Sequence, residues 1–206
     1  MKAAPSYLEP YVLAAQKHGG SFRSLLWASP QTQAVRFAAL TSLADFRNKT
    51  ILDVGCGRAD LLDYLVDRGI EVDHYLGLEA VDILADAAEA KHHPRCTILR
   101  CDFVRDPACM AVGADIIVFS GSLNTLDKNV FPVVLQAAYA AAEEQLVFNF
   151  LNSPILAHAV YLTWHPVREV LLWARTLSPD VKYLENYLPG DATVRIRKAT
   201  RTGKMT

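Results

Sequence analysis

The stretch that decides the fold lies at residues 51–61 and reads Ile-Leu-Asp-Val-Gly-Cys-Gly-Arg-Ala-Asp-Leu. An apolar, β-branched run leads into glycine, and a helical pattern follows at residues 60–68. Gly55 can adopt a backbone conformation that a side chain would resist, and Gly57 lets the main chain approach a ligand closely. The stretch therefore predicts a strand, a glycine loop and a helix at the carboxyl edge of an open α/β sheet, where such sheets bind ligands.

The residues around the two glycines indicate the kind of ligand. A dinucleotide fingerprint would place its third glycine at position 60, where this chain has Asp60. An aspartate at the start of a helix disfavours a pyrophosphate, which needs the amide donors there. Asp53, two residues before the first glycine, suits a cationic ligand such as an ammonium or sulfonium group. The stretch therefore disfavours NAD.

The order of strand and helix repeats along the chain. Strands are expected at residues 50–54, 75–78, 96–100, 115–119 and 146–150, and helices at 60–68, 82–91, 130–142 and 166–175. Strands separated by helices of this length predict βαβ units and a parallel sheet. A Pro-Gly-Asp turn at 189–191 joins the extended runs 181–187 and 192–197, which predicts a hairpin that adds an antiparallel pair at one edge.

The first 49 residues have a helical pattern at residues 6–17 and 31–46, with Pro30 ahead of the second helix. Two arrangements are compatible with this pattern. The helices form a lid over the carboxyl edge of the sheet, or they form a layer that covers one of its faces.

Acidic residues also follow the second and third strands. Glu79 lies 22 residues after Gly57, where an acidic side chain can accept bonds from both hydroxyls of a ribose. The alternative is a solvated loop glutamate. Asp102 can accept from an exocyclic amine such as that of adenine, with Phe103 or Val81 covering the ring. The alternative for Asp102 is a helix or turn cap.

Together these features resemble the class I S-adenosylmethionine-dependent methyltransferases. The resemblance covers residues 50–198 and rests on the loop at 52–59, the segment 76–79 with its terminal acid, Asp102 and the final hairpin. Many members have a third glycine in the loop, where this chain has Ala59; one added methyl group narrows the loop only slightly. The resemblance implies S-adenosylmethionine as methyl donor and S-adenosylhomocysteine (SAH) as product.

The resemblance also implies an architecture. We expect a Rossmann-like three-layer α/β sandwich with a mostly parallel seven-stranded sheet whose last strand is antiparallel. Residues 1–49 would be an N-terminal helical cap of the same domain, and residues 50–206 would form the methyltransferase domain.

Ten residues are expected to bind the cofactor. Most of them follow strands at the carboxyl edge of the sheet, and Arg36 reaches the site only if the N-terminal helices cap it; an ordinary surface arginine is the alternative. The expected residues are Asp53, Gly55, Cys56, Gly57, Glu79, Ala80, Asp102, Phe103, Ser120 and Arg36.

Methyl transfer is an in-line displacement in which the protein mainly aligns the acceptor, the methyl group and the sulfur. A proton acceptor is needed only if the nucleophile must lose a proton at or before attack. The candidates for a catalytic role are Asn124, His158 and His165. Asn124 is equally compatible with a helix or turn cap, and each histidine with a surface or core position.

The acceptor-binding candidates come from the N-terminal helices, from the segment after the fourth strand and from the segment after the fifth. They are Tyr11, Trp27, Ser122, Asn124, Asn152 and Tyr161. The Asn/Asp-Pro-Pro-aromatic motif of DNA and some protein and RNA amine methylases is absent from residues 120–124, which weakens a nucleic-acid amine as acceptor.

Composition narrows the class of protein further. The 206 residues carry 21 Lys and Arg against 22 Asp and Glu, so the protein lacks an overall basic field for nucleic acid. Residues 51–120 carry thirteen acids and six bases, whereas residues 195–204 carry five bases and no acid. That end could contact phosphate or be a solvated terminus.

The four cysteines form no C-x-x-C pair and no metal spacing, so we expect no metal and reduced thiols. No stretch of about 20 predominantly apolar residues predicts a membrane span. We therefore expect a cytoplasmic methyltransferase that acts on a small molecule rather than on nucleic acid. The alternatives are an RNA or protein methyltransferase and a non-catalytic S-adenosylmethionine-binding protein.

Overall fold

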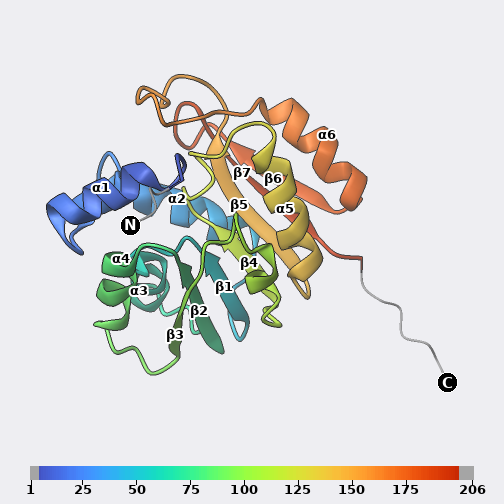
Figure 1. Ribbon diagram of the computed structural model, residues 1–206. Coiled ribbons are helices and arrows are strands. Elements are labelled where there is room, and N and C mark those ends of the chain that lie inside the picture. The colour runs from blue at the N-terminus through green and yellow to red at the C-terminus, as the bar shows by residue number, and fades with distance from the viewer. Residues whose placement is uncertain (1–4, 200–206) are drawn as a thin grey trace.

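Seven strands form one sheet in the order β3-β2-β1-β4-β5-β7-β6 (Figure 1). The computed structural model describes residues 5–199. Strands β1 to β5 pair in parallel, and β7 is antiparallel to both β5 and β6. The strands are β1 Thr50–Val54, β2 His74–Glu79, β3 Cys96–Arg100, β4 Ile116–Phe119, β5 Gln145–Leu151, β6 Val181–Glu185 and β7 Asp191–Arg197. The predicted parallel sheet and C-terminal hairpin are confirmed.

Helices cover both faces of the sheet. The α-helices are α1 Glu9–His18, α2 Pro30–Leu43, α3 Asp60–Asp67, α4 Asp82–Glu89, α5 Val130–Ala141 and α6 Val167–Leu177. Two 3-10 helices, η1 Phe22–Leu25 and η2 Pro107–Met110, were not predicted. Helix α6 begins at Val167, one residue later than expected, and Pro166 is its N-cap residue. None of the helices in residues 5–199 is long and apolar enough to cross a membrane.

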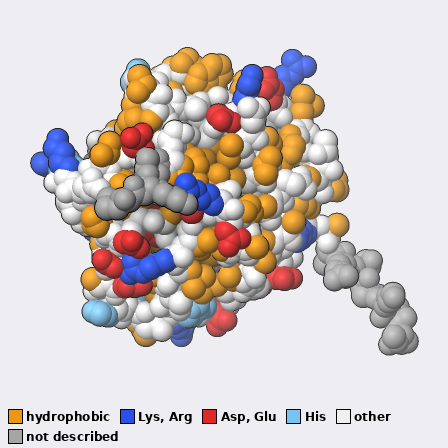
Figure 2. Space-filling model, in the orientation of Figure 1, with side chains coloured by type: hydrophobic (Ala, Val, Ile, Leu, Met, Phe, Trp, Pro, Cys, Tyr) orange, Lys and Arg blue, Asp and Glu red, His pale blue; other side chains and the backbone are white. Residues whose placement is uncertain are grey.

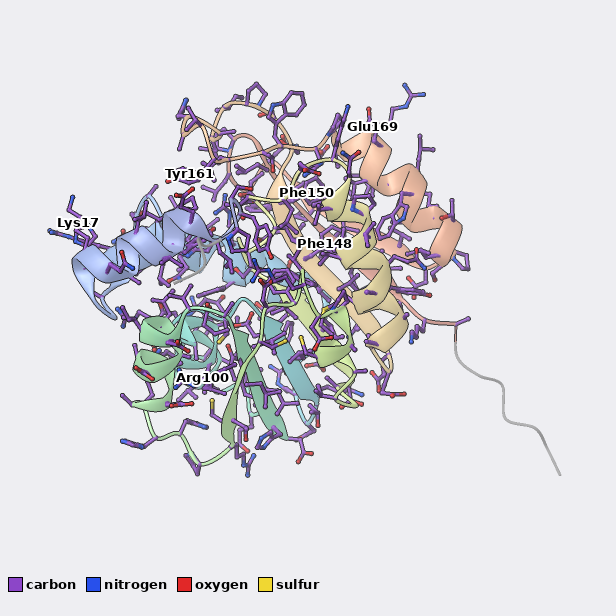
Figure 3. All side chains as sticks on the ribbon, viewed as in Figure 1. Lys17, Arg100, Phe148, Phe150, Tyr161 and Glu169 are labelled. Carbon is purple, nitrogen blue, oxygen red and sulfur yellow. The ribbon has the colours of Figure 1, made fainter. Side chains whose placement is uncertain are left out.

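Alternation along the strands sends apolar side chains to two separate cores. Ile51 packs with α2 and α3 on one face, whereas Leu52 and Val54 pack on the other with α5 and α6. Phe148 and Phe150 of β5 belong to the second core, where both rings lie near that of Phe131 in α5 (Figure 3). This burial on both faces explains why the central strands are almost continuously apolar.

The N-terminal helices divide between the two predicted arrangements. Helix α2 starts at a capping box between Ser29 and Thr32 and buries Phe37 and Leu40 against the sheet. Helix α1 instead packs with η1 and α4 in a small separate cluster that includes Ala15. The first helix therefore lies beside the carboxyl edge, and the second is part of the layer on the sheet.

The glycine loop is held against β2. The amides of Gly55 and Cys56 both donate to the carbonyl of Leu78, at 2.8 and 3.0 Å. Gly57 has a φ of 57°, in the left-handed region that favours glycine. A Cβ atom on Gly77 of β2 would lie 2.7 Å from Cys56 Sγ. Strand β2 thus carries no side chain where the loop crosses it.

We expect Gly77→Ala to destabilise the fold by about 1–3 kcal/mol, because the added methyl overpacks the contact between the loop and β2. Urea denaturation would measure the loss. Adding Cys56→Ala should recover part of it, since the sulfur is one of the two atoms the methyl meets at 2.7 Å. Unchanged stability in Gly77→Ala would show that the loop does not press on this strand.

Candidate functional site

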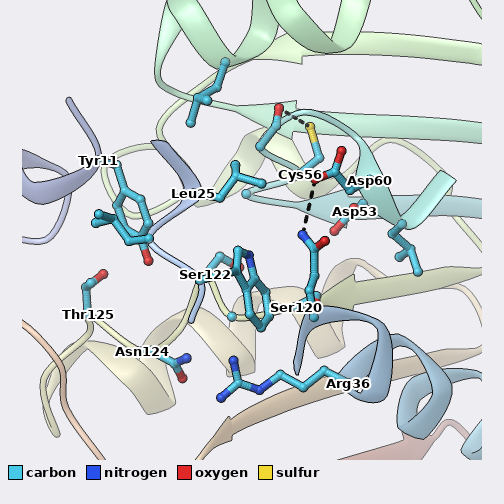
Figure 4. A pocket seen from close by; sticks show the side chains of 18 of the residues that line it. Tyr11, Leu25, Arg36, Asp53, Cys56, Asp60, Ser120, Ser122, Asn124 and Thr125 are labelled. Carbon is cyan, nitrogen blue, oxygen red and sulfur yellow. Dashed lines mark hydrogen bonds between the residues drawn. The ribbon is translucent and has the colours of Figure 1, made fainter. Parts of the chain in front are cut away.

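A cavity of about 280 Å³ lies at the carboxyl edge of the sheet, under the N-terminal segment (Figure 4). Its walls are mostly apolar, with a few polar groups, as is usual for small-molecule sites. Residues from α1, η1 and α2 line one side, and the segments that follow β1, β2, β4 and β5 line the other. The N-terminal segment is therefore part of the site.

Asp53 lies at one end of the cavity with 3% of its surface exposed. Its carboxylate accepts a hydrogen bond from the Tyr75 hydroxyl. Burial raises the pKa of Asp53 to about 7, and the nearby charges of Glu79 and Asp60 act in the same direction, whereas the Tyr75 bond opposes the rise. A cation beside Asp53 would favour its ionised form.

Glu79 also lines this end and fastens the glycine loop. Its Oε2 accepts from the amide of Gly57 at 2.8 Å, and its Oε1 accepts from the amides of Ala80 and Val81 at 2.9 and 2.8 Å. Burial raises the pKa of Glu79, and these three bonds oppose the rise. The solvated-loop alternative for Glu79 is wrong, because the residue is only 6% exposed.

Asp102 is not among the residues that line the cavity. Its carboxylate accepts from the Tyr7 hydroxyl at 2.8 and 3.0 Å and from the amide of Val104 at 3.1 Å. The turn-cap alternative therefore describes its contacts. Phe103, the other residue expected near adenine, does line the cavity, and so does Tyr7.

Polar groups from the segment after β4 occupy the middle of the cavity wall. Ser122 Oγ donates to the carbonyl of Val54 at 2.6 Å. Ser120 Oγ is buried and has no hydrogen-bond partner in the described part of the chain. The Trp27 ring packs on Gly121, since a Cβ atom there would lie 2.8 Å from its Cζ2.

Arg36 is a buried residue, so the surface alternative for it is wrong. Its guanidinium is ion-paired with Asp191 of β7 and lies 4.7 Å from the centre of the Trp27 ring. The Tyr187 hydroxyl also donates to Asp191, at 2.6 Å. Among the described residues that line the cavity, Arg36 is the one with a cationic side chain. Its Nη1 bonds to nothing within residues 5–199.

The far end of the cavity is shaped by the segments that follow β4 and β5. Asn124 Oδ1 accepts from the amide of Leu151 at 3.2 Å, which leaves its amino group without a partner in residues 5–199. Thr125, Tyr11 and Tyr161 line the same end. Burial raises the pKa of the Tyr11 hydroxyl, and the neighbouring Tyr161 adds to the rise.

Besides Asp102, three candidates from the sequence lie outside the cavity. His165 is stacked on Phe131 at 3.8 Å and bonds the carbonyl of Leu126, so it is a core histidine. Burial lowers its pKa. His158 is exposed, and the Asn152 amide donates to the carbonyl of Asp191 at 3.5 Å. Of the three proposed catalytic residues, only Asn124 reaches the site.

The basic C-terminal end is only partly described. Arg195 is a buried residue of β7 that is ion-paired with Asp180, rather than part of a solvated tail. Residues 200–204 lie outside the described residues. Within residues 5–199, no cluster of three or more His, Cys, Asp or Glu side chains is placed to hold a metal ion.

Sequence reasoning missed several lining residues. Tyr7 and Thr125 have no motif around them, and Gln33 comes from the first turn of α2, where its amide donates to Asp60 at 3.4 Å. A burial pattern could have indicated Gln33, because a polar residue on the inner face of a helix needs a partner. The other two are brought to the cavity by chain segments that are distant in the sequence.

Comparisons with known proteins agree on the fold. No protein-family model matches the chain, and no curated protein matches it either. Among solved structures, DhpI in complex with SAH has 14% identity and a TM-score of 0.69, over 95% of this chain and 97% of that one. Magnesium protoporphyrin IX methyltransferase (ChlM) from Synechocystis PCC 6803 has 11% identity and a TM-score of 0.66, over 97% and 100%.

The small RNA methyltransferase HEN1 is also similar, with 15% identity and a TM-score of 0.63, over 82% of this chain and 25% of that one. At these identities the likeness concerns the fold. The chain therefore has the Rossmann-like fold of class I methyltransferases, as its sequence motifs predicted.

We expect Glu79→Ala to lower the free energy of unfolding of the ligand-free protein by about 1–3 kcal/mol, because backbone amides lose a buried acceptor. Glu79→Gln should cost less, since an amide oxygen can still accept from Ala80 and Val81. Urea denaturation would compare both with Glu71→Ala, whose side chain is 81% exposed. Equal stability of all three variants would contradict the role of Glu79 in holding the loop.

The buried Asp53 should make stability depend on pH. Its pKa of about 7 in the fold lies above the ordinary value of 3.8, so between these values the folded state binds more protons than the unfolded state. Stability is therefore lost as pH rises through this window, by at most about 1.4 kcal/mol per pH unit. Relative to Asp53→Asn, the wild type should weaken from about pH 5 to 7. A constant difference between the two in urea denaturation would contradict this.

Proposed function

We propose that the protein is an S-adenosylmethionine-dependent methyltransferase that acts on a small molecule. The observation that carries the proposal is the convergence of a glycine loop with two buried acids, Asp53 and Glu79, on one cavity at the carboxyl edge of the sheet. The fold shared with ChlM and DhpI, whose structures contain SAM or SAH, supports it.

The lining residues fit this cofactor in their chemistry. In the proposed arrangement, Asp53 accepts from the ammonium group, and Glu79 uses its remaining lone pairs for the ribose hydroxyls. Phe103 covers the adenine ring, and Arg36 binds the carboxylate through Nη1, which has no partner within residues 5–199. Ser120 Oγ, which is buried and has no partner within residues 5–199, is an additional polar group for the ligand.

Gly55, Cys56, Gly57 and Ala80 complete the proposed set as the main-chain surface against the cofactor. The set does not include Asp102, because its carboxylate bonds the Tyr7 hydroxyl.

When bound, S-adenosylmethionine supplies a methyl group on a sulfonium, whose thioether product is a neutral leaving group. The task of the chain is then to align the acceptor and to keep water out. Tyr11 and Trp27 cover the cavity from the N-terminal side, with Ser122, Asn124 and Tyr161 opposite them. Residues 1–49 are proposed as a cap of the same domain as residues 50–206.

A small acceptor is supported by the shape and charge of the site. The cavity holds about 280 Å³ under a roof of N-terminal residues, and Arg36 is the one cationic side chain among the described residues that line it. HEN1 is by its name an RNA methyltransferase, but it is about four times as long as the part that this chain covers. RNA or protein as acceptor remains the alternative, as does a non-catalytic cofactor-binding protein.

A cytoplasmic location is proposed together with the methyltransferase function, and the four free cysteines support it.

We expect the wild type to bind S-adenosylmethionine and SAH in calorimetry, with an affinity that falls below about pH 7. A protonated Asp53 must release its proton to bind a cation, so the affinity should fall about tenfold per pH unit below that pKa. Asp53→Asn should bind weakly at every pH, and Asp45→Asn, with a side chain 69% exposed, should match the wild type. The same affinity in Asp53→Asn and the wild type would refute the role.

The acceptor class can be tested with S-adenosylmethionine labelled in its methyl group. The labelled cofactor and the protein are incubated separately with a small-molecule extract, with total RNA and with protein. We expect label in the small-molecule fraction. Label in RNA or protein would support the alternative acceptors, and cofactor binding without any transfer would support a non-catalytic protein.

A further inference from the structure

Beyond Ser122, the lining residues other than Arg36 carry no charge. The lining residues of this end of the cavity are Asn124, Thr125, Leu151, Leu156, Tyr161, Leu162 and Leu188. The acidic lining residues, Asp53, Asp60 and Glu79, all come from the glycine loop, the start of α3 and the end of β2. The acceptor end therefore offers no counter-charge to an ionic acceptor, whose burial would be costly.

Arg36 does not change this charge balance. Its guanidinium is bonded through Nε and Nη2 to Asp191, a residue that is 1% exposed. If the two side chains separated, each would be left as an unpaired buried charge, which is costly. The ion pair therefore stays together. In the proposed arrangement, the remaining Nη1 binds the cofactor's carboxylate.

Aromatic and leucine side chains give the acceptor end its shape. Tyr11 and Trp27 approach it from the N-terminal side, and Tyr161 lies opposite, on the segment between β5 and α6. Residues 152–165 of that segment include no Asp, Glu, Lys or Arg. Figure 2 shows apolar side chains along this edge of the molecule, where Val160 and Ile155 are exposed. Flat aromatic molecules pack well against the aromatic and leucine side chains that line the acceptor end.

Among residues 5–199, no side chain at the acceptor end is placed to act as a general base. His158 and His165 lie outside the cavity. The raised pKa of Tyr11 keeps its hydroxyl protonated at neutral pH. The carboxylates of Asp53 and Glu79 are engaged by Tyr75 and by backbone amides. A nucleophile that must lose a proton to react, such as a phenol, finds no partner there.

We infer that the acceptor is an uncharged aromatic molecule whose nucleophile is a nitrogen that is neutral at pH 7, in an aromatic amine or a nitrogen heterocycle. This inference rests on the proposed function. In the transfer, the nitrogen lone pair forms the bond to the methyl carbon while the carbon–sulfur bond breaks, and that electron pair stays on sulfur. The nitrogen becomes cationic, and an amine then gives its proton to water. The amino group of Asn124 and the hydroxyl of Thr125 orient the acceptor.

A matched series on one ring skeleton tests the inference. The probes are quinoline and 1-naphthylamine as neutral nitrogen acceptors, 1-naphthol as a phenol, 1-naphthoate as an anion and 1-naphthylmethylamine as a cation. Binding of each probe to the SAH-loaded protein is measured by calorimetry, and methyl transfer is measured by mass spectrometry. We expect the neutral nitrogen compounds to bind at least about tenfold more tightly than either charged probe and to be methylated on nitrogen.

A charge placed in the acceptor end should reverse this preference. Leu162→Asp should keep the SAH affinity, lose at least about tenfold in affinity for 1-naphthylamine, and gain affinity for 1-naphthylmethylamine. Leu172→Asp is the matched control, because Leu172 is 56% exposed on α6 and lies outside the cavity. It should behave as the wild type.

The outcomes separate this inference from the function on which it rests. Failure of SAH to bind the wild type would overturn both. If SAH binds, tighter binding of 1-naphthoate or 1-naphthylmethylamine overturns the neutral acceptor, and faster methylation of 1-naphthol overturns nitrogen as the nucleophile. Binding of SAH without binding of any probe overturns the aromatic class and leaves the cofactor site standing.

Discussion

The site depends on one buried carboxylate that joins two strands through main-chain amides. Glu79, at the end of β2, accepts from Gly57 of the loop that follows β1 and from the two amides after its own strand. A carboxylate can accept several bonds at once, and a buried one must find them. Because the buried Glu79 carboxylate needs these amides as donors, the glycine loop and the end of β2 are held together. The position of the glycine loop, and with it the cavity, follows from this.

Charge within the cavity is separated along its length. Acids lie at the end formed by the glycine loop, and neutral side chains lie at the end formed by the segments after β4 and β5. Arg36 stands at the wall between α2 and β7 with its charge matched by Asp191. A low-dielectric cavity strengthens such differences, so the two ends offer a ligand different electrostatic environments. This division is the physical basis of the two-substrate function proposed for the protein.

Motifs with a local cause could be recognised in the sequence. The glycine loop, Asp53 and Glu79 could be placed because each lies at or just after the carboxyl end of a strand, and parallel strands bring these ends to one edge. The contacts of Asp102, by contrast, depend on Tyr7, which lies 95 residues away. His165 could not be assigned either, since stacking on Phe131 in another element decides that it belongs to the core.

The sequence by itself determined the sheet, its hairpin and the acidic half of the site, because strand periodicity and turn residues act over a few positions. Only the tertiary structure decided the other half. The packing of α1, α2 and the segment after β5 over the sheet edge decides which polar groups face the cavity beyond Ser122. The same packing buries Arg36 against Asp191. Such packing joins residues of distant segments, and no short pattern records it.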